Sequence, residues 1–180
     1  MDSIAAIILA AGKGTRMKSS KVKVLHPLAG EPLLSFPLEA ARAADAERIV
    51  VVVGHQADEV RRHFSGRDGI DFALQEEQHG TGHAVACAAP LLRGFQGTVL
   101  ILCGDVPLIR AETLQRMLAG HRESGATVTV LTAVVDNPRG YGRIVKAGAG
   151  LVVGIVEEKD ATEEQRAVRE INSGIYCVDG

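Results

Sequence analysis

A short stretch near the N-terminus places glycines and basic side chains directly after an apolar run. Residues 4–10 are continuously apolar, and the sequence "AAGKGTRM" runs from Ala10 to Met17. Glycine lets backbone N–H groups approach an anion closely, while Lys13 and Arg16 add positive charge. A cradle for phosphate or a nucleotide is one interpretation, and an ordinary solvated glycine turn is the other. The spacing matches neither the dinucleotide fingerprint nor the G-x-x-x-x-G-K phosphate loop.

A second polar stretch, "QEEQHGTGHA", comes directly before a helical pattern. Thr81 stands between two glycines and could cap that helix, and the exposed N–H groups there also suit a base edge or an anion. Capping alone and ligand binding are both open. His79 and His83 are four residues apart and could share a helix face, but the lack of an H-E-x-x-H pattern argues against a metal pair.

A third stretch, "CGDVP", follows the apolar run "TVLIL". Asp105 is a carboxylate at the end of an expected buried strand, where it could hold Mg²⁺ against a phosphate, because magnesium prefers hard oxygen ligands and needs few from the protein. The alternative is a turn or capping aspartate. Cys103 lies at the end of the buried run, so packing explains it better than thiol chemistry.

Apolar runs alternate with amphipathic patterns along most of the chain. Strands are expected at residues 4–10, 48–54, 71–75, 98–105 and 126–135, and helices at 32–44, 57–64, 81–92 and 111–124. This alternation predicts an α/β fold with helices on both faces of a mostly parallel sheet. Ligands bind such sheets beyond the carboxyl ends of the strands, where all three polar stretches lie. The sequence therefore predicts a single site.

The pattern changes after Val135. "DNPRGYGRIV" predicts a turn-rich connection, residues 151–170 a strand followed by an acidic helix, and "INSGIYCV" a last strand. We expect this tail to be an insertion or lid on the same domain.

Composition narrows the class of protein. The chain of 180 residues is 46% hydrophobic, and its 20 basic and 22 acidic residues give a net charge of −2. One globular domain is the expectation, and neither the charge nor the 3% aromatic content favours a nucleic-acid partner. Three cysteines without a C-x-x-C pair argue against disulfides and structural zinc and favour a reducing cytoplasm. Residues 1–3 carry no positive charge, which argues against a secretory signal, and no apolar run has membrane-spanning length.

Six motifs in order carry a family resemblance. They are residues 9–17, residues 75–84, Gly104 to Pro107, Gly140 to Ile144, Gly154 to Glu157, and Ile171 to Gly174. Together they resemble the uridyltransferase domain of the bacterial bifunctional enzyme that makes UDP-N-acetylglucosamine. The first motif alone indicates only the wider group of sugar nucleotidyltransferases and molybdenum-cofactor guanylyltransferases.

The resemblance implies a Rossmann-like three-layer nucleotidyltransferase fold with a mostly parallel mixed sheet. It also implies a reaction between UTP and N-acetylglucosamine 1-phosphate, with Mg²⁺ as cofactor, that supplies peptidoglycan and lipopolysaccharide synthesis in the cytoplasm. Two alternatives stay open. One is another sugar-1-phosphate or cofactor nucleotidyltransferase, and the other is a catalytically weak nucleotide-binding fragment.

The resemblance also implies roles for particular residues. Arg16 and Lys23 would hold the phosphates as catalytic residues, with Lys13 a weaker candidate, and Asp105 would bind Mg²⁺. The other implied residues bind substrate. They are Leu9, Ala10, Ala11 and Gly12 for the uridine nucleotide, Gln75, Gly80 and Thr81 for uracil, Gly142, Glu157 and Asn172 for N-acetylglucosamine, and Cys103 and Gly104 as further positions.

The resemblance bears on domain organisation as well. Residues 1–180 would be one nucleotidyltransferase domain cut short at its C-terminal end, before the family's second metal ligand, an asparagine. The family's left-handed β-helix acetyltransferase domain would be absent, and a homo-oligomer formed through that domain is left open. Val22 stands where the family usually has proline, and Cys103 where related enzymes can have an aromatic residue.

Overall fold

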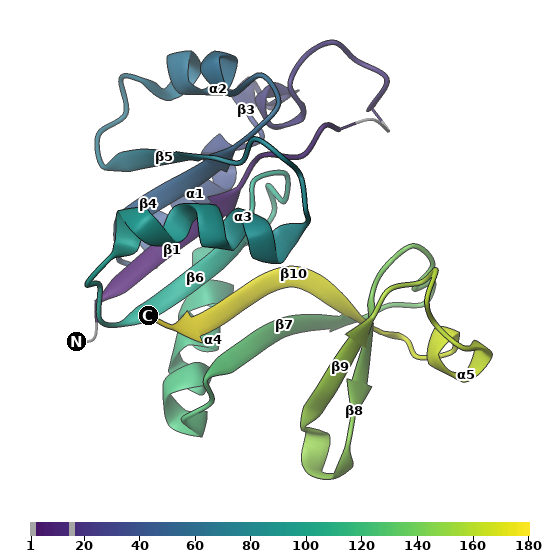
Figure 1. Cartoon of the computed structure of the whole chain (residues 1–180). Helices are drawn as coiled ribbons and strands as arrows, with labels where there is room; N and C mark the ends of the chain where they lie inside the picture. The colour runs from purple at the N-terminus through teal and green to yellow at the C-terminus, as the bar shows by residue number, and fades with distance from the viewer. Residues whose placement is uncertain (1–2, 15–16) are drawn as a thin grey trace. The chain divides into compact units, whose positions relative to one another are not determined.

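The computed structural model describes residues 3–14 and 17–180, which belong to two compact units (Figure 1). The first unit comprises Met1–Thr129 and Tyr176–Gly180, and the second comprises Val130–Ile175. Arg16, one of the expected phosphate ligands, lies outside the described residues.

The first unit is built on a mostly parallel sheet in the order β5-β4-β1-β6-β10. Its parallel strands are β1 (Ile4–Leu9), β4 (Ala46–Val53), β5 (Ile70–Leu74) and β6 (Thr98–Cys103). The end of β10 (Glu170–Asp179) pairs with β6 in the antiparallel direction. The expected α/β class and mixed, mostly parallel sheet are confirmed.

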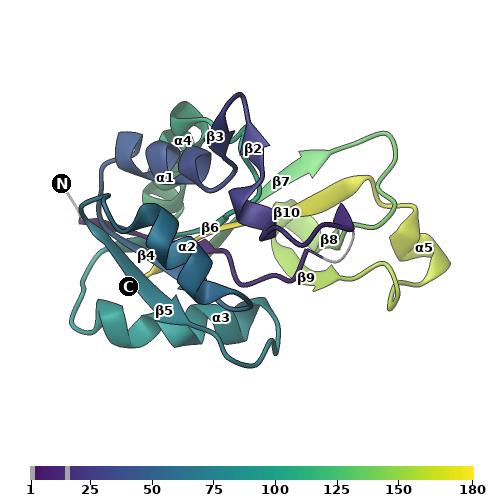
Figure 2. The same cartoon turned by 90° about the horizontal axis from the view of Figure 1, so that it is seen from above.

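Helices cover both faces of this sheet. They are α1 (Ser35–Ala43), α2 (Ala57–Phe64), α3 (Thr81–Ala88) and α4 (Ala111–Ser124). Figure 1 shows α3 in front of the sheet and α1 behind it, and Figure 2 shows α1 beside α4. Since alternate strand residues point to opposite faces, Ala5 and Ile7 of β1 pack in one cluster with Ala84 and Ala88 of α3.

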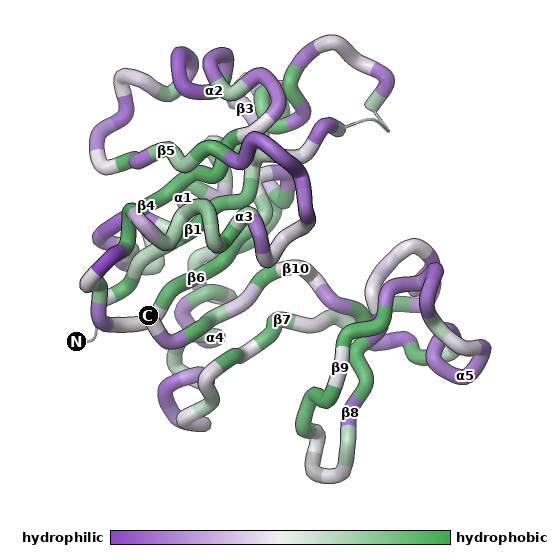
Figure 3. The backbone as a smooth tube through the Cα atoms, viewed as in Figure 1, coloured by the Kyte–Doolittle hydropathy of each residue, from purple (hydrophilic) through white to green (hydrophobic). Residues whose placement is uncertain are grey.

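The central strands are apolar because both of their faces are covered. The first five residues of β1 and of β6 are all buried. Figure 3 shows β1, β4 and β6 as hydrophobic segments that end in polar connections. Parallel strands covered on both faces read as continuous apolar runs, which is why the sequence located them well.

Prolines explain where two helices differ from expectation. The helix expected from residue 32 begins at Ser35, because Pro32 belongs to the short strand β3 (Glu31–Pro32), which pairs with β2 (Pro27–Leu28). The helix expected to end at residue 92 changes at Ala89 into a 3-10 turn, η3 (Ala89–Leu92). Pro90 lacks the N–H that a continuing α-helix would use.

The second unit is a small antiparallel assembly. β8 (Arg143–Lys146) pairs with β9 (Val152–Val156) and with the start of β10, which also pairs with β7 (Val128–Val134). The prediction of a turn-rich connection was wrong for its last residues, which form β8. The expected acidic helix is reduced to α5 (Glu163–Arg166), which Thr162 and Gln165 close in a capping box.

Across the residues described, none of the helices combines the length and the apolar character that crossing a membrane requires.

Candidate functional site

The loop after β1 takes its shape from glycines. Gly14 has a left-handed φ of +61°, and a Cβ there would lie 2.7 Å from the Cβ of Lys23. A Cβ on Gly54 would lie 2.9 Å from that of Ala11. A Cβ on Gly12, by contrast, would meet open space, so this glycine leaves room beside the loop. The glycines at 14 and 54 therefore allow close packing, while Gly12 borders the free volume that a ligand would need.

Lys23 and Asp105 form an ion pair between two separate loops. Lys23 begins the 3-10 turn η2 (Lys23–Leu25), and Asp105 follows β6. Their side chains are 34% and 32% exposed, so solvent and ligands reach both charges. A pair this exposed contributes little to stability and is open to exchange with other ions.

The donor set at Asp105 fits magnesium better than zinc. Within residues 3–14 and 17–180, no cluster of three or more His, Cys, Asp or Glu side chains is arranged to hold a metal. A single carboxylate suits Mg²⁺, which commonly keeps several waters and takes its other ligands from substrate phosphates. His79 and His83 lie with ring centroids 5.1 Å apart, but they belong to no such cluster.

The loop after β6 is closely packed. A Cβ on Gly104 would lie 3.0 Å from the Leu9 carbonyl oxygen, which accepts a hydrogen bond from the Gly104 N–H at 2.9 Å. Burial, with the Asp105 carboxylate nearby, raises the pKa of the Cys103 thiol to about 11, against the lesser opposite effect of Lys23. Cys103 therefore stays a thiol at neutral pH and is a poor nucleophile.

Gln75 and Gly80 meet at the start of α3. Gln75 directly follows β5 and is buried, and its Nε2 donates to the Gly80 carbonyl oxygen at 3.1 Å. Of the two interpretations of Thr81, capping of α3 is wrong: Gly80 is the N-cap, with φ 98°, and no side chain makes the cap hydrogen bond. Thr81 is instead the first helical residue and is exposed.

These loops line one open cavity of about 370 Å³ in the first unit. Ten of its lining residues were expected from the sequence: Leu9, Ala10, Ala11, Gly12, Lys23, Gln75, Gly80, Thr81, Cys103 and Asp105. The sequence reasoning missed Val24, Gln78 and Ala84. Gln78 donates to the Ala11 carbonyl oxygen and so ties the loop after β5 to the loop after β1. Its place within the "QEEQHGTGHA" motif was the only signal that could have found it.

The residues expected to bind the sugar lie together in the second unit. The Asn172 N–H donates to the Gly142 carbonyl oxygen at 2.9 Å. A Cβ on Gly142 would lie 3.2 Å from Glu157 Oε1 and 3.6 Å from the Cβ of Asn172. The absence of a side chain at Gly142 thus makes room for the Glu157 carboxylate and for the Asn172 side chain.

Comparisons with known proteins identify relatives of this chain. The chain is 64% identical over 179 residues to a protein of Pelobacter propionicus named "Bifunctional protein GlmU", and 63% identical to proteins of that name from Geobacter metallireducens and Geobacter sulfurreducens. Each alignment covers 99% of this chain but only 38–39% of the relative, so the chain spans about two fifths of their length. The resemblance seen in the sequence motifs is confirmed.

A solved structure shows the same fold at low sequence identity. It is described as a glucose-1-phosphate thymidylyltransferase from Bacillus anthracis, with a TM-score of 0.83 and 18% identity, over 98% of this chain and 72% of that one. Residues 6–169 match the family described as the MobA-like NTP transferase domain. Together with the glycine-shaped loop beside the Lys23–Asp105 pair, this match establishes that the chain belongs to the MobA-like NTP transferase domain family.

Proposed function

We propose that the chain catalyses uridyl transfer from UTP to N-acetylglucosamine 1-phosphate, giving UDP-N-acetylglucosamine and pyrophosphate. The observation that carries the proposal is the cavity in the first unit, where the loops after β1, β5 and β6 bring together a glycine-bordered space, a buried amide and a separable Lys23–Asp105 pair. The high identity to proteins named GlmU supports it. The product would serve cell-wall precursor synthesis in the cytoplasm.

The reaction needs positioning more than a protein nucleophile. A phosphate oxygen of the sugar phosphate attacks the α-phosphorus of UTP in line. The new bond between that oxygen and the α-phosphorus forms as the bond to the bridging oxygen breaks, and pyrophosphate leaves with the electron pair. The attacking phosphate is already charged at neutral pH, so the protonated Cys103 thiol is not required.

Charge neutralisation falls to Lys23 and Arg16, together with the Mg²⁺ that Asp105 would hold. Lys23 would exchange the Asp105 carboxylate for phosphate oxygens, and Arg16 would contribute a bidentate contact of the kind that guanidinium groups make. Asp105, released from Lys23, would hold Mg²⁺. When bound there, the ion supplies positive charge that offsets the developing negative charge on the phosphates.

The remaining expected residues would bind the nucleotide and the sugar. In the first unit Gln75, Gly80 and Thr81 would contact the uracil, while the backbone from Leu9 to Gly12 would lie along the nucleotide. In the second unit Gly142, Glu157 and Asn172 would bind the N-acetylglucosamine. The charged and amide groups give directional hydrogen bonds, which a sugar with many hydroxyl groups needs for selective binding.

Pyrophosphate release tests the proposal. We would measure it with Mg²⁺ for UTP, CTP, ATP and GTP, each with N-acetylglucosamine 1-phosphate or glucose 1-phosphate. The expected result is release with UTP and N-acetylglucosamine 1-phosphate well above every other pair. A different preferred pair would favour another sugar-1-phosphate nucleotidyltransferase. UTP binding without release from any pair would favour the nucleotide-binding fragment.

A further inference from the structure

The buried amide of Gln75 is held from two sides. Gln75 is 4% exposed, and its backbone N–H donates to the Val53 carbonyl oxygen at 2.8 Å, which anchors the residue to the end of β4. Its side-chain Nε2 lies 3.1 Å from the Gly80 carbonyl oxygen and 3.2 Å from His83 Nδ1. Both hydrogens of the amide group therefore have an acceptor within the protein.

The hydrogen-bond partners fix the orientation of the Gln75 side-chain amide. A backbone carbonyl oxygen only accepts hydrogen bonds, so the atom of Gln75 that faces Gly80 is the NH₂ nitrogen. His83 Nδ1 then accepts the second hydrogen, which places the proton of the neutral imidazole on Nε2. That Nε2 lies 3.8 Å from Cys87 Sγ, one turn further along α3. The orientation thus follows from the partners of the amide.

The amide oxygen is left for a ligand. Among the described residues, no hydrogen bond engages Gln75 Oε1, and Gln75 lines the cavity of the first unit. Because Gln75 lines the open cavity, a ligand with a matching N–H can donate a hydrogen bond to this oxygen. Uracil has a hydrogen on its ring nitrogen N3, whereas the same atom of cytosine is an acceptor.

We propose that His83 is a positioning residue that determines pyrimidine selectivity. By accepting the second Nε2 hydrogen, it keeps the Gln75 oxygen, rather than its NH₂ group, available to the base. This inference rests on the assignment of Gln75 to the base in the proposed function. His83 itself does not line the cavity, and it acts only through Gln75.

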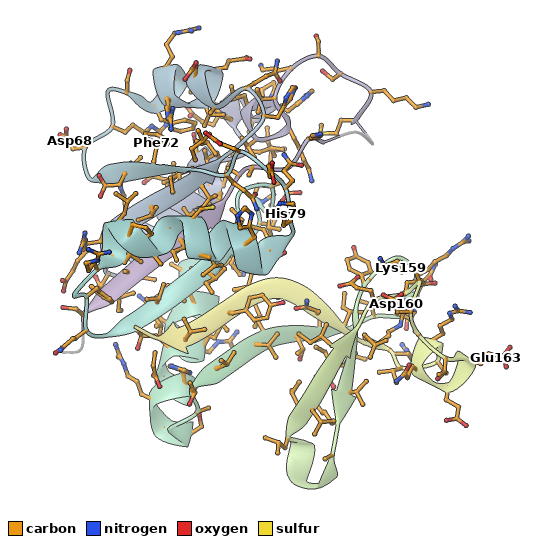
Figure 4. All side chains as sticks on the ribbon, viewed as in Figure 1. Asp68, Phe72, His79, Lys159, Asp160 and Glu163 are labelled. Atoms are coloured by element: carbon orange, nitrogen blue, oxygen red, sulfur yellow. The ribbon has the colours of Figure 1, made fainter. Side chains whose placement is uncertain are left out.

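The polar side chains next to His83 do not accept the second hydrogen of the Gln75 amide in its place. His79, which Figure 4 shows close to the N-terminal end of α3, pairs through Nε2 with Glu77 Oε2 at 2.7 Å. Its contact with His83 is between rings, with centroids 5.1 Å apart. Neither His79 nor Glu77 hydrogen-bonds to Gln75 in the described part of the chain, so neither replaces the His83 acceptor.

The test compares UTP and CTP affinities, by titration calorimetry in the presence of Mg²⁺. His83→Leu removes one of the two acceptors and keeps a good helix former, so only the Gly80 carbonyl oxygen then holds the NH₂ group and the Gln75 amide turns more readily toward the base. The ratio of the CTP to the UTP dissociation constant should fall about threefold to tenfold, the value of one hydrogen bond. His83→Gln, whose Oε1 can accept, should keep most of the parent ratio. His63→Leu makes the same exchange at an exposed position on α2 and should leave the ratio unchanged.

A double variant separates positioning from a general structural effect. In a Gln75→Ala background, His83→Leu should cause no further change in the ratio, because its effect passes through the missing amide. A thermal melt of each variant checks the fold, and His83→Met takes the place of a His83→Leu chain that does not fold. Equal losses for UTP and CTP, or a loss that persists without Gln75, would overturn the inference.

Failure of the inference can be told from failure of the proposed function. A parent chain that does not prefer UTP to CTP would contradict both. A parent that prefers UTP, with a preference that Gln75→Ala narrows and His83→Leu leaves intact, would contradict only the role of His83.

Discussion

The two units use charged pairs in opposite ways. In the first unit Lys23 and Asp105 face an open cavity, and each is about a third exposed. In the second, Arg143 is 2% exposed and donates to the Glu158 carboxylate at 2.8 Å and to the carbonyl oxygens of Tyr141 and Arg166, while Glu158 itself is 35% exposed. Ligands can separate an exposed pair at small cost, whereas the buried Arg143 guanidinium would be an uncompensated charge without its partners. The exposure of the basic side chain therefore distinguishes a pair suited to binding from one that stabilises the fold.

The largest expected effect is a loss of activity when the exposed Lys23–Asp105 pair is changed. Asp105→Asn removes the proposed magnesium ligand while keeping the size of the side chain. Pyrophosphate release should fall by about 100-fold or more, the loss typical when one group that stabilises transition-state charge is removed. The far-ultraviolet circular dichroism spectrum should not change. The same loss is expected for the parent chain in EDTA.

The control is Asp58→Asn, which changes a carboxylate that pairs with Arg61 on the surface of α2 and is 88% exposed. Its activity should match that of the parent. An Asp105→Asn chain with unchanged magnesium dependence would exclude Asp105 as a ligand.

The pair that contains the buried Arg143 should show its effect in stability. Arg143→Met removes the charge that Glu158 faces and leaves two carbonyl oxygens without their donor. The free energy of unfolding should fall by about 1–3 kcal/mol, because the two carbonyl oxygens lose the donor that Arg143 supplies. Urea unfolding followed by circular dichroism measures the change.

Lys23→Met is the matched exchange at the exposed pair. It should lower the free energy of unfolding by no more than about 1 kcal/mol, but it should weaken UTP binding clearly. A large loss of stability here, or a small one for Arg143→Met, would remove the distinction between the two pairs.

A smaller effect is expected on the affinity for the nucleotide, through the residue proposed to contact uracil. Gln75→Ala should weaken UTP binding by about 1–3 kcal/mol and narrow its advantage over CTP, because a polar group of the base loses its partner. Titration calorimetry measures both affinities. Unchanged affinities for both nucleotides would contradict the role of Gln75 in reading uracil.

The smallest effect is expected on how the stability of the fold depends on pH. Hydrogen bonds from the Gly140 N–H and from Arg143 hold the pKa of the Glu158 carboxyl below its usual 4.5. Because the folded pKa is the lower one, this stabilisation is complete above the unfolded value and is lost as pH falls through the folded value. Melting temperatures between pH 7 and pH 3 should therefore fall less steeply for Glu158→Gln than for the parent. Parallel curves would contradict this coupling.

The sequence predicted the first unit more accurately than the second. Helices α2 and α4 agree with expectation at both ends, and the strands agree to within a few residues. β8 was missed, because Gly140 and Gly142 made its segment read as a turn, and its pairing with β9 is not visible in a local pattern. The acidic helix was expected to be longer than α5 because charged residues at helical spacing say nothing of what packs against them.

The sequence by itself determined the α/β class, the family and the loops that carry the chemistry. It could do so because strands buried on both faces are continuous apolar runs and because ligand loops follow their carboxyl ends. Only the tertiary structure decided how single side chains are held. The Lys23–Asp105 pair joins residues 82 positions apart in the sequence, and Gly80 and His83 orient Gln75 only once α3 has formed beside β5. Such contacts depend on which elements pack together, and no local pattern of residues encodes that choice.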